Sequence, residues 1–284
     1  MNSTNSKPTG VVPVVLTKTT PEYRASENDV MAVEEPLDIR ITTQDSNVAV
    51  THNVAVTMRT PGQDLELALG FLFSESLITG KADVDWEQTR RAADDADCNR
   101  ITVALQPEIA FDPEHLSRHV FTSSSCGVCG KISRENIVAK CPRATSEPPI
   151  FSASIFGDLP HRLRENQAGF KQTGGLHAAA SFDRSGSVGP IYEDVGRHNA
   201  LDKLVGDFLR RGSLSHTTGL LLSGRISFEL VQKAGLAGFK VIAAIGAPSS
   251  LAVELARDLD ITLIGFLKTT SMNIYHGADR IRSA

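Results

Sequence analysis

The second half of the chain alternates short, wholly apolar segments with segments of helical periodicity, and this alternation narrows the fold more than any other feature. Strands are predicted at 219–223, 240–245 and 261–266, and helices at 201–211, 227–237 and 249–258. Strands that are apolar throughout and alternate with short helices are typical of a parallel sheet covered on both faces. The sequence therefore predicts a three-layer α/β/α domain.

The first half of the chain has a different pattern. Residues 37–41 and 54–58 alternate apolar and polar side chains with period two, as half-buried strands do, and 99–105 is a further predicted strand. Asp64 precedes an apolar helical face and is a candidate N-cap. The overall class is therefore α+β, and the predicted divisions are a disordered polar tail (1–12), a β-rich domain (13–120), a mobile loop (121–131) and the α/β domain (132–284).

Composition excludes several classes of protein. A net charge of −4 over 284 residues gives no global attraction to nucleic acid or to an anionic membrane. No stretch reaches about 18 consecutive apolar residues, and the first residues lack the charged start and apolar core of a secretion signal. Four cysteines are too few for a disulfide scaffold. We expect a cytoplasmic protein that binds neither nucleic acid nor membrane, and a homodimer, the commonest closed assembly.

Two of the four cysteines, Cys126 and Cys129, lie three residues apart in a loop of serines and glycines at 122–131. Nothing in this loop is large enough to bury the sulfur atoms, and Lys131 would favour a thiolate. The pair has four interpretations: half of a zinc site, a thioredoxin-like redox pair, incidental cysteines, or the carrier of a persulfide. A structural zinc site needs four ligands, and Cys98 and Cys141 show no second pair spacing.

Polar clusters follow each predicted strand of the α/β domain, at 223–225, 246–250 and 268–271. Ligands of such sheets bind at the carboxyl ends of the strands, beside helix N-termini. Arg225 is able to bind a phosphate with two parallel hydrogen bonds. This edge of the sheet is therefore the predicted ligand site.

A polar run at 193–203 precedes the first helical face of the α/β domain. Acidic residues favour a helix N-terminus, but the cations Arg197 and His198 oppose the helix dipole there. Together with Asn199 they indicate an anionic ligand or a fixed hydrogen-bond network.

His177 follows the pair Gly174 and Gly175. The three residues form either a simple turn or a place where backbone and imidazole approach a ligand. A zinc deaminase is not indicated, because no Cys-x-x-Cys follows the second strand and His198 is not followed by the required Glu.

Five blocks in fixed order resemble one family, the formate dehydrogenase accessory sulfurtransferases (FdhD family). The resemblance extends from about residue 34 to the C-terminus, and its blocks are 122–131, 173–179, 193–203, 223–225 and 273–275. It implies a β-rich domain followed by a cytidine-deaminase-like domain without zinc. It also implies that the chain holds no metal of its own.

The resemblance implies that a cysteine desulfurase loads sulfur onto Cys126 as a persulfide, with Cys129 in relay or release. The sulfur would pass to the bis(molybdopterin guanine dinucleotide) cofactor, called bis-MGD below, and so activate formate dehydrogenase. The guanine dinucleotide is expected near Phe266, Leu267, Lys268, Thr269, Thr270 and Ser271. Lys268 and Thr269 depart from the Arg and Gly usual in the family, so bidentate phosphate binding is lost there.

Seven residues outside that segment complete the predicted cofactor site: Gly174, Gly175, His177, Arg197, His198, Asn199 and Arg225. Two other functions compete with sulfur transfer. A thiol–disulfide oxidoreductase would use Cys126 and Cys129 as a dithiol. A nucleotide-binding adaptor would need neither cysteine.

Overall fold

The computed structural model describes residues 10–45, 48–94, 99–111, 134–141, 149–214 and 219–283. The predicted loop 121–131, with Cys126 and Cys129, lies outside the described residues, and so does Cys98. The first strand begins at Val11, within the predicted polar tail.

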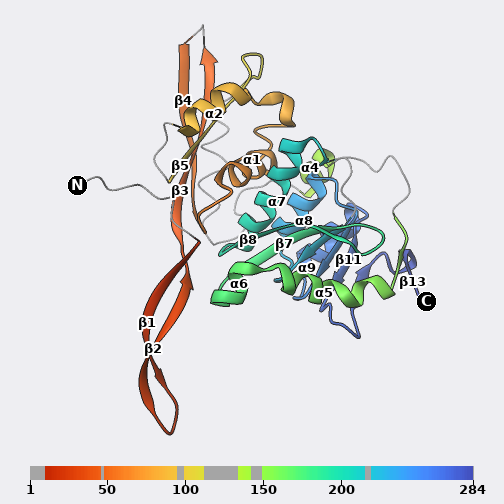
Figure 1. The fold of residues 1–284 in the computed structure, drawn as a ribbon. Coiled ribbons are helices and arrows are strands. Elements are labelled where there is room, and N and C mark those ends of the chain that lie inside the picture. The colour runs from red at the N-terminus through yellow and green to blue at the C-terminus, as the bar shows by residue number, and fades with distance from the viewer. Residues whose placement is uncertain are drawn as a thin grey trace.

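A six-stranded sheet forms the centre of the α/β domain (Figure 1), with the strand order β12-β11-β10-β9-β7-β8. The three predicted strands are confirmed as β9 (Gly219–Leu222), β10 (Val241–Ala244) and β11 (Thr262–Gly265), and they are parallel. The sheet as a whole is mixed rather than parallel. Three further strands add in antiparallel orientation: β7 (His177–Phe182), β8 (Val188–Asp194) and β12 (Asn273–His276). A short turn joins β7 to β8, and antiparallel neighbours need no longer connection.

Both faces of this sheet are covered, so the three-layer prediction is confirmed. Alternate side chains of one strand enter two cores: Leu220 and Leu222 pack on one face, and Leu221 on the other. The first face lies under α4 (Arg134–Lys140), α7 (Arg197–Arg211), α8 (Phe228–Leu236) and α9 (Ser250–Asp258). The second face lies under α5 (Ser154–Asn166), with α6 (Ala168–Thr173) beside it. A small pair of strands, β6 (Phe151–Ser152) and β13 (Ile281–Arg282), also lies beside α5. The short helix η4 (Ala278–Arg280) precedes β13 in the chain.

The N-terminal part is β-rich, as the sequence predicts. A hairpin of β1 (Val11–Thr19) and β2 (Arg24–Ala32) precedes a three-stranded sheet of β3 (Glu35–Asp45), β4 (Val48–Arg59) and β5 (Arg100–Ala104). The sheet shares a core with α1 (Asp64–Ser74), and η1 (Lys81–Asp83) and α2 (Trp86–Asp94) follow α1 in the chain. Leu37, Ile39 and Ile41 place their side chains in that core, and so does Val54. Val56 and Met58 are exposed, so the predicted half-buried alternation holds for 37–41 but not for 54–58.

The start of α1 differs from the prediction that Asp64 is its N-cap. Gln63 occupies the cap position with φ of 54°, and Asp64 is the first helical residue. The Asp64 carboxylate instead accepts from the Arg59 side chain, with Nε at 2.9 Å from Oδ1. Arg59 is fully buried, so its guanidinium requires a carboxylate partner, and this requirement competes with helix capping.

The helices α1 and α7 join the two parts of the chain. A glycine of each helix faces the backbone of the other: a Cβ on Gly70 would lie 1.9 Å from the Asp202 carbonyl oxygen, and a Cβ on Gly206 1.8 Å from that of Glu66. The two backbones therefore approach more closely than any side chain would allow. None of the helices in the described part of the chain has both the length and the apolar character that crossing a membrane requires.

Candidate cofactor-binding site

The carboxyl ends of β9, β10 and β11 form one edge of the sheet, tied together by backbone hydrogen bonds. The amide of Gly246 donates to the Gly224 carbonyl at 3.1 Å, and that of Phe266 donates to the Gly246 carbonyl at 3.0 Å. Because adjacent strands lie about 4.8 Å apart, the loop after β11 is roughly 10 Å from the loop after β9. The three predicted polar clusters therefore lie along one edge of the sheet, and ligand binding there stays a prediction.

Four of the predicted site residues lie together at this edge, and we call them the basic cluster: His177, Arg197, His198 and Arg225. The His177 imidazole packs on the backbone of Gly224, since a Cβ built there would lie 3.1 Å from His177 Nδ1. The guanidinium groups of Arg197 and Arg225 and the burial of the ring lower the pKa of His177, with burial the larger effect. Arg225 is exposed, whereas the Arg197 Nε is buried and has no hydrogen-bond partner among the described residues.

His198 is the most perturbed group of the basic cluster. Its Nε2 lies 3.1 Å from Ser227 Oγ and 3.1 Å from a carboxylate oxygen of Glu229. Burial of the ring, followed by the charges of Arg197 and Lys233, lowers the pKa of His198 from 6.5 to about 3. The effect of burial and of two cations on the pKa of His198 is larger than that of the half-exposed Glu229 carboxylate, so the imidazole is neutral at physiological pH.

We expect His198 to remain neutral throughout the range in which an ordinary histidine titrates. In ¹³C-histidine NMR, its resonance should stay constant from pH 8 to about pH 5, with assignment from His198→Gln. The unfolded chain takes up this proton near pH 6.5 and the folded chain near pH 3. The linked stability contribution is therefore complete above pH 6.5 and declines as the pH falls toward 3. A midpoint between pH 6 and 7 for this resonance would contradict the burial argument.

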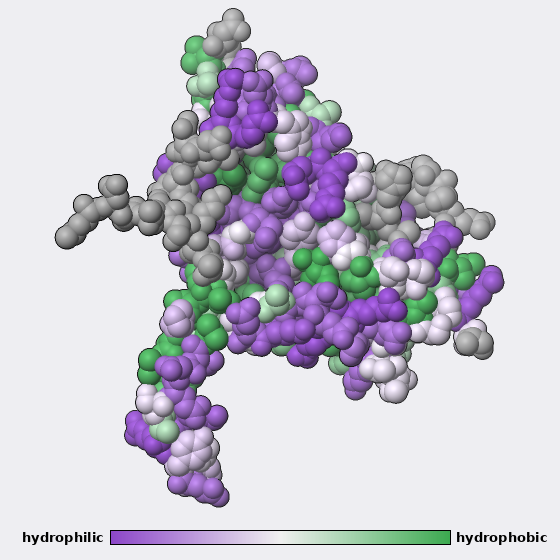
Figure 2. All heavy atoms as spheres, viewed as in Figure 1, coloured by the Kyte–Doolittle hydropathy of each residue, from purple (hydrophilic) through white to green (hydrophobic). Residues whose placement is uncertain are grey.

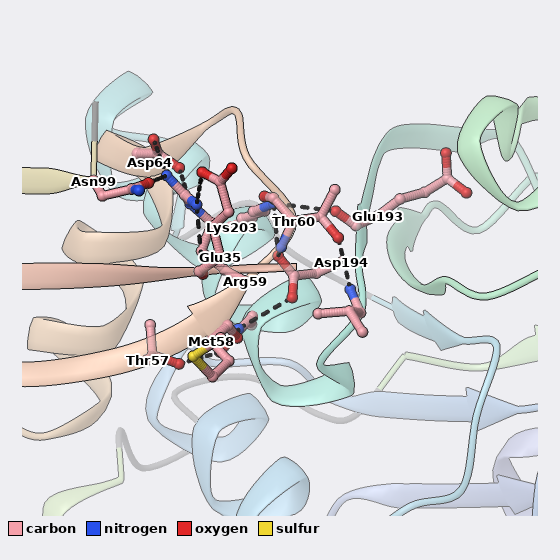
Figure 3. A network of polar contacts seen from close by, with 12 residues as sticks. Glu35, Thr57, Met58, Arg59, Thr60, Asp64, Asn99, Glu193, Asp194 and Lys203 are labelled. Atoms are coloured by element: carbon pink, nitrogen blue, oxygen red, sulfur yellow. Dashed lines mark hydrogen bonds and ion pairs between the residues drawn. The ribbon is translucent and has the colours of Figure 1, made fainter. Parts of the chain in front are cut away.

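The polar run at 193–203 divides between two roles. Arg197 and His198 belong to the basic cluster. Asp194 and Lys203 hold the α/β domain to the end of β4 (Figure 3), and Asn199 does so through a hydrogen bond to Met58. Lys203 Nζ lies 2.8 Å from Asp194 Oδ2, and both side chains are at most 1% exposed. Lys203 also donates to the Thr60 carbonyl at 3.0 Å, and Asp194 accepts from the Thr60 amide at 3.1 Å.

Asn199 is the member of the predicted site whose side chain is fully engaged with protein groups. Its amide nitrogen donates to the Met58 carbonyl at 2.8 Å and to Asp194 Oδ1 at 3.1 Å, and its oxygen accepts from Thr57 Oγ1 at 3.3 Å. Of the two interpretations of this run, the fixed hydrogen-bond network describes Asn199. The anionic ligand remains a prediction for Arg197 and His198.

The glycine pair before His177 ends a helix. Gly174 is the C-cap of α6, with φ of 67°, a left-handed conformation that glycine adopts without strain. Its amide donates to the Phe170 carbonyl at 2.7 Å. Gly175 is exposed, and its amide donates to Thr173 Oγ1 at 3.2 Å. Both glycines therefore serve a turn that delivers His177 to the sheet edge, and their contact with a ligand stays a prediction.

The segment after β11 forms a second part of the edge. Phe266 has φ of 50°, uncommon for a residue with a side chain, and is 42% exposed. Leu267 is buried in the second core, whereas Lys268, Thr269, Thr270 and Ser271 are exposed and make a turn closed by the Lys268 amide on the Ser271 carbonyl. A cavity of about 200 Å³ lies between this turn and the first turn of α5, lined in part by Ser154 and Gly157.

The described cysteine, Cys141, is buried in the first core, and burial raises its pKa to about 11. It is therefore a thiol at neutral pH. Within the described ranges, no three His, Cys, Asp or Glu side chains converge as metal ligands. The roles of Cys126 and Cys129 remain predictions, because both lie outside those ranges.

Sequence reasoning placed Ser223 at the ligand edge but missed its structural contact, and it missed Glu229 altogether. Ser223 Oγ accepts from the Ala178 amide at 2.8 Å and so ties β7 to the end of β9. Glu229 lies in the first turn of α8, where the helix dipole favours any acidic residue. The sequence therefore gives no separate indication that Glu229 contacts His198.

Three comparisons with known proteins agree. Residues 32–282 match the FdhD/NarQ family. The sulfur carrier protein FdhD of Streptomyces coelicolor is 45% identical over 89% of each chain, and that of Sulfolobus acidocaldarius is 43% identical over 94% of this chain and 97% of its own. The fold is shared with a crystal structure from Desulfotalea psychrophila described as a formate dehydrogenase accessory protein, with a TM-score of 0.75 at 19% identity over 96% and 100% of the two chains. The chain belongs to the FdhD/NarQ family.

Proposed function

We propose that this chain is a sulfurtransferase of the sulfur-carrier type. It accepts sulfur from a cysteine desulfurase as a persulfide on Cys126 and delivers it to bis-MGD for formate dehydrogenase. The observation that carries the proposal is the basic cluster at the carboxyl edge of the sheet, in a chain whose relatives are named sulfur carriers. That edge offers an anionic dinucleotide two guanidinium groups beside neutral histidines.

The two cysteines are suited to sulfur transfer by their chemistry. The Cys126 thiolate attacks the outer sulfur of the donor persulfide, the S–S bond of the donor breaks, and the donor cysteine leaves as a thiolate. Release of that sulfur as sulfide requires two electrons. The Cys129 thiolate supplies them by attacking the inner sulfur, which forms a Cys126–Cys129 disulfide. A cellular thiol then reduces the disulfide for the next cycle.

The α/β domain supplies groups for the dinucleotide. Arg225 is exposed, and the Arg197 Nε is buried without a hydrogen-bond partner among the described residues, so the two are candidates to bind the pyrophosphate. Phe266 offers an exposed aromatic ring on which a guanine could stack. The cavity beside Lys268 and Ser271, at about 200 Å³, is smaller than typical ligand pockets of about 300–1,000 Å³. It suits one phosphate group, and the rest of the cofactor would lie along the open edge.

The test separates the two halves of the proposal with three variants. Each variant is incubated with a desulfurase and cysteine, then analysed by mass spectrometry for one added sulfur, about 32 Da, and for rescue of formate dehydrogenase in cells that lack the native carrier. Cys126→Ala should lose both the adduct and the rescue. Arg197→Ala/Arg225→Ala should keep the adduct and lose the rescue, because loading needs no dinucleotide. Cys98→Ala is the matched control and should keep both.

The competing functions give different outcomes. An adduct that persists in Cys126→Ala, together with full rescue, would end the assignment of Cys126 as the sulfur carrier. Full rescue by Cys126→Ala/Cys129→Ala would favour the nucleotide-binding adaptor, which needs neither cysteine. Disulfide reduction that depends equally on Cys126 and Cys129, with no sulfur adduct on either, would favour the oxidoreductase. Full rescue by the double arginine variant would remove the basic cluster from the cofactor site but leave the persulfide chemistry intact.

A further inference from the structure

The α/β domain has a mainly hydrophilic surface on the face drawn in Figure 2, with smaller hydrophobic areas between the polar ones. On a surface of this kind, ligand recognition depends on the direction of individual hydrogen bonds. In the basic cluster, the guanidinium groups of Arg197 and Arg225 are donors without an acceptor atom. A neutral histidine differs, because one ring nitrogen donates and the other accepts. The nitrogen of His198 that carries the proton therefore decides what this residue can bind.

Two side chains at the start of α8 contact the Nε2 atom of His198. Ser227 Oγ lies at 3.1 Å, and because a hydroxyl can donate or accept, this contact alone permits either tautomer. Glu229 Oε2 also lies 3.1 Å from Nε2, and a carboxylate oxygen can only accept. An unprotonated Nε2 would set its lone pair against that carboxylate. Glu229 therefore favours the tautomer with the proton on Nε2.

A second proton on the His198 ring is opposed by its surroundings. Burial is the largest cause of its low pKa of about 3, followed by the charges of Arg197 and Lys233. The Lys233 ammonium group is held in place, since both carboxylate oxygens of the buried Asp202 lie 2.8 Å from it. The Nδ1 atom of His198 therefore keeps its lone pair, and it has no hydrogen-bond partner among the described residues.

We propose that Glu229 is a positioning residue, which fixes His198 in the Nε2–H tautomer and so makes Nδ1 a hydrogen-bond acceptor in the basic cluster. A lone pair repels phosphate oxygens and binds an uncharged N–H or O–H group instead. The inference rests on the proposed cofactor site, in which the guanine edge and the ribose hydroxyls have that chemistry. Arg197 and Arg225 then bind the pyrophosphate, and His198 recognises the nucleoside.

The first test measures the tautomer in the full chain without ligand. In protein labelled with ¹⁵N-histidine, long-range ¹H–¹⁵N correlation spectra distinguish a protonated ring nitrogen from an unprotonated one, with assignment from His198→Gln. The wild type should carry the proton on Nε2 alone. Glu229→Met should also populate the Nδ1–H tautomer, because the Ser227 hydroxyl can then donate to Nε2.

Ser227→Ala is the matched control for Glu229→Met. Ser227 is the N-cap of α8, but its side chain caps no backbone amide, so the substitution removes only the contact with His198. Since the Glu229 carboxylate remains, the control should keep the wild-type tautomer. Thermal unfolding followed by circular dichroism confirms that each variant is folded.

The second test measures the affinities of GDP, ADP and pyrophosphate for the same variants by isothermal titration calorimetry. Glu229→Met should weaken GDP binding by about fivefold, which corresponds to about 1 kcal/mol for one hydrogen bond. It should leave pyrophosphate binding unchanged, because pyrophosphate binds to the two arginines. An equal loss for ADP would assign the donor to the ribose that both nucleotides share, and a loss for GDP alone would assign it to the guanine edge.

Each half of the proposal has results that would overturn it. A proton on Nδ1 in the wild type, or a Glu229→Met spectrum identical to that of the wild type, would remove Glu229 as the positioning residue. Unchanged GDP binding by Glu229→Met, or equal weakening of GDP and pyrophosphate, would remove recognition of a donor by Nδ1. A wild type that binds neither GDP nor pyrophosphate would contradict the proposed cofactor site itself, and the spectra would still decide the tautomer.

Discussion

Replacing Lys203 by Ala should lower the free energy of unfolding by about 3–5 kcal/mol, the cost of leaving one member of a buried ion pair unpaired. The Asp194 carboxylate, fully buried in the native protein, would lose the ammonium 2.8 Å from its Oδ2. The Thr60 and Glu193 carbonyls would lose a donor at the same time. Thermal unfolding should shift downward by about 5–8 °C for a chain of this size.

A surface lysine provides the control for this substitution. Lys18 pairs with Glu27 at 3.3 Å, but their side chains are 55% and 40% exposed. An ion pair of that kind contributes about 0–1 kcal/mol, so Lys18→Ala should leave the unfolding temperature nearly unchanged. Differential scanning calorimetry compares the two. Equal small shifts would mean that the Asp194 carboxylate finds another partner when Lys203 is removed.

The buried pair connects the stability of the fold to the geometry of the candidate site. Asp194 accepts from the Gly196 amide at 2.8 Å, immediately before Arg197 and His198. The same carboxylate binds Thr60 at the end of β4. The N-terminal sheet therefore holds the first turn of α7 in place, and with it half of the basic cluster.

Much of the α/β domain could be predicted from the sequence because its strands are short and apolar throughout. Such segments have few alternatives to the centre of a covered sheet. The flanking strands were not predicted: β8 and β12 have mixed composition, and their pairing depends on tertiary neighbours. The β1–β2 hairpin was also missed. Its first strand contains Pro13, which is typical of edge strands and weakens the local signal.

The candidate site shows the same division. Arg225 follows β9, and Arg197 and His198 open α7, which are the positions where the rule for parallel sheets expects a ligand. His177 instead begins the antiparallel strand β7, so that rule does not place it. The separate roles of Asn199 and Lys203 could not be predicted, because their partners Met58 and Thr60 are more than a hundred residues away. One polar run therefore contains both ligand candidates and structural residues, and only the contacts distinguish them.

Gly206→Ala should destabilise the protein by about 3 kcal/mol, although Ala is ordinarily the better helix former by about 1 kcal/mol. The substitution is destabilising here because the new methyl group would lie 1.8 Å from the Glu66 carbonyl oxygen and 2.9 Å from the Gly70 amide nitrogen. Both are backbone atoms of α1, so rotating a side chain cannot relieve the clash. The helices must separate, and the cores that contain Leu204 and Leu209 would be opened.

Gly80 offers the matched control, since its φ of −173° is accessible to any residue and nothing lies within 4 Å of a Cβ built there. Gly80→Ala should unfold at the temperature of the wild type or slightly above it, because the substitution restricts the unfolded chain. Urea denaturation followed by circular dichroism measures both variants. If Gly206→Ala is as stable as Gly80→Ala, α1 and α7 are free to move apart. The two helices would then not form a fixed connection between the N-terminal sheet and the basic cluster.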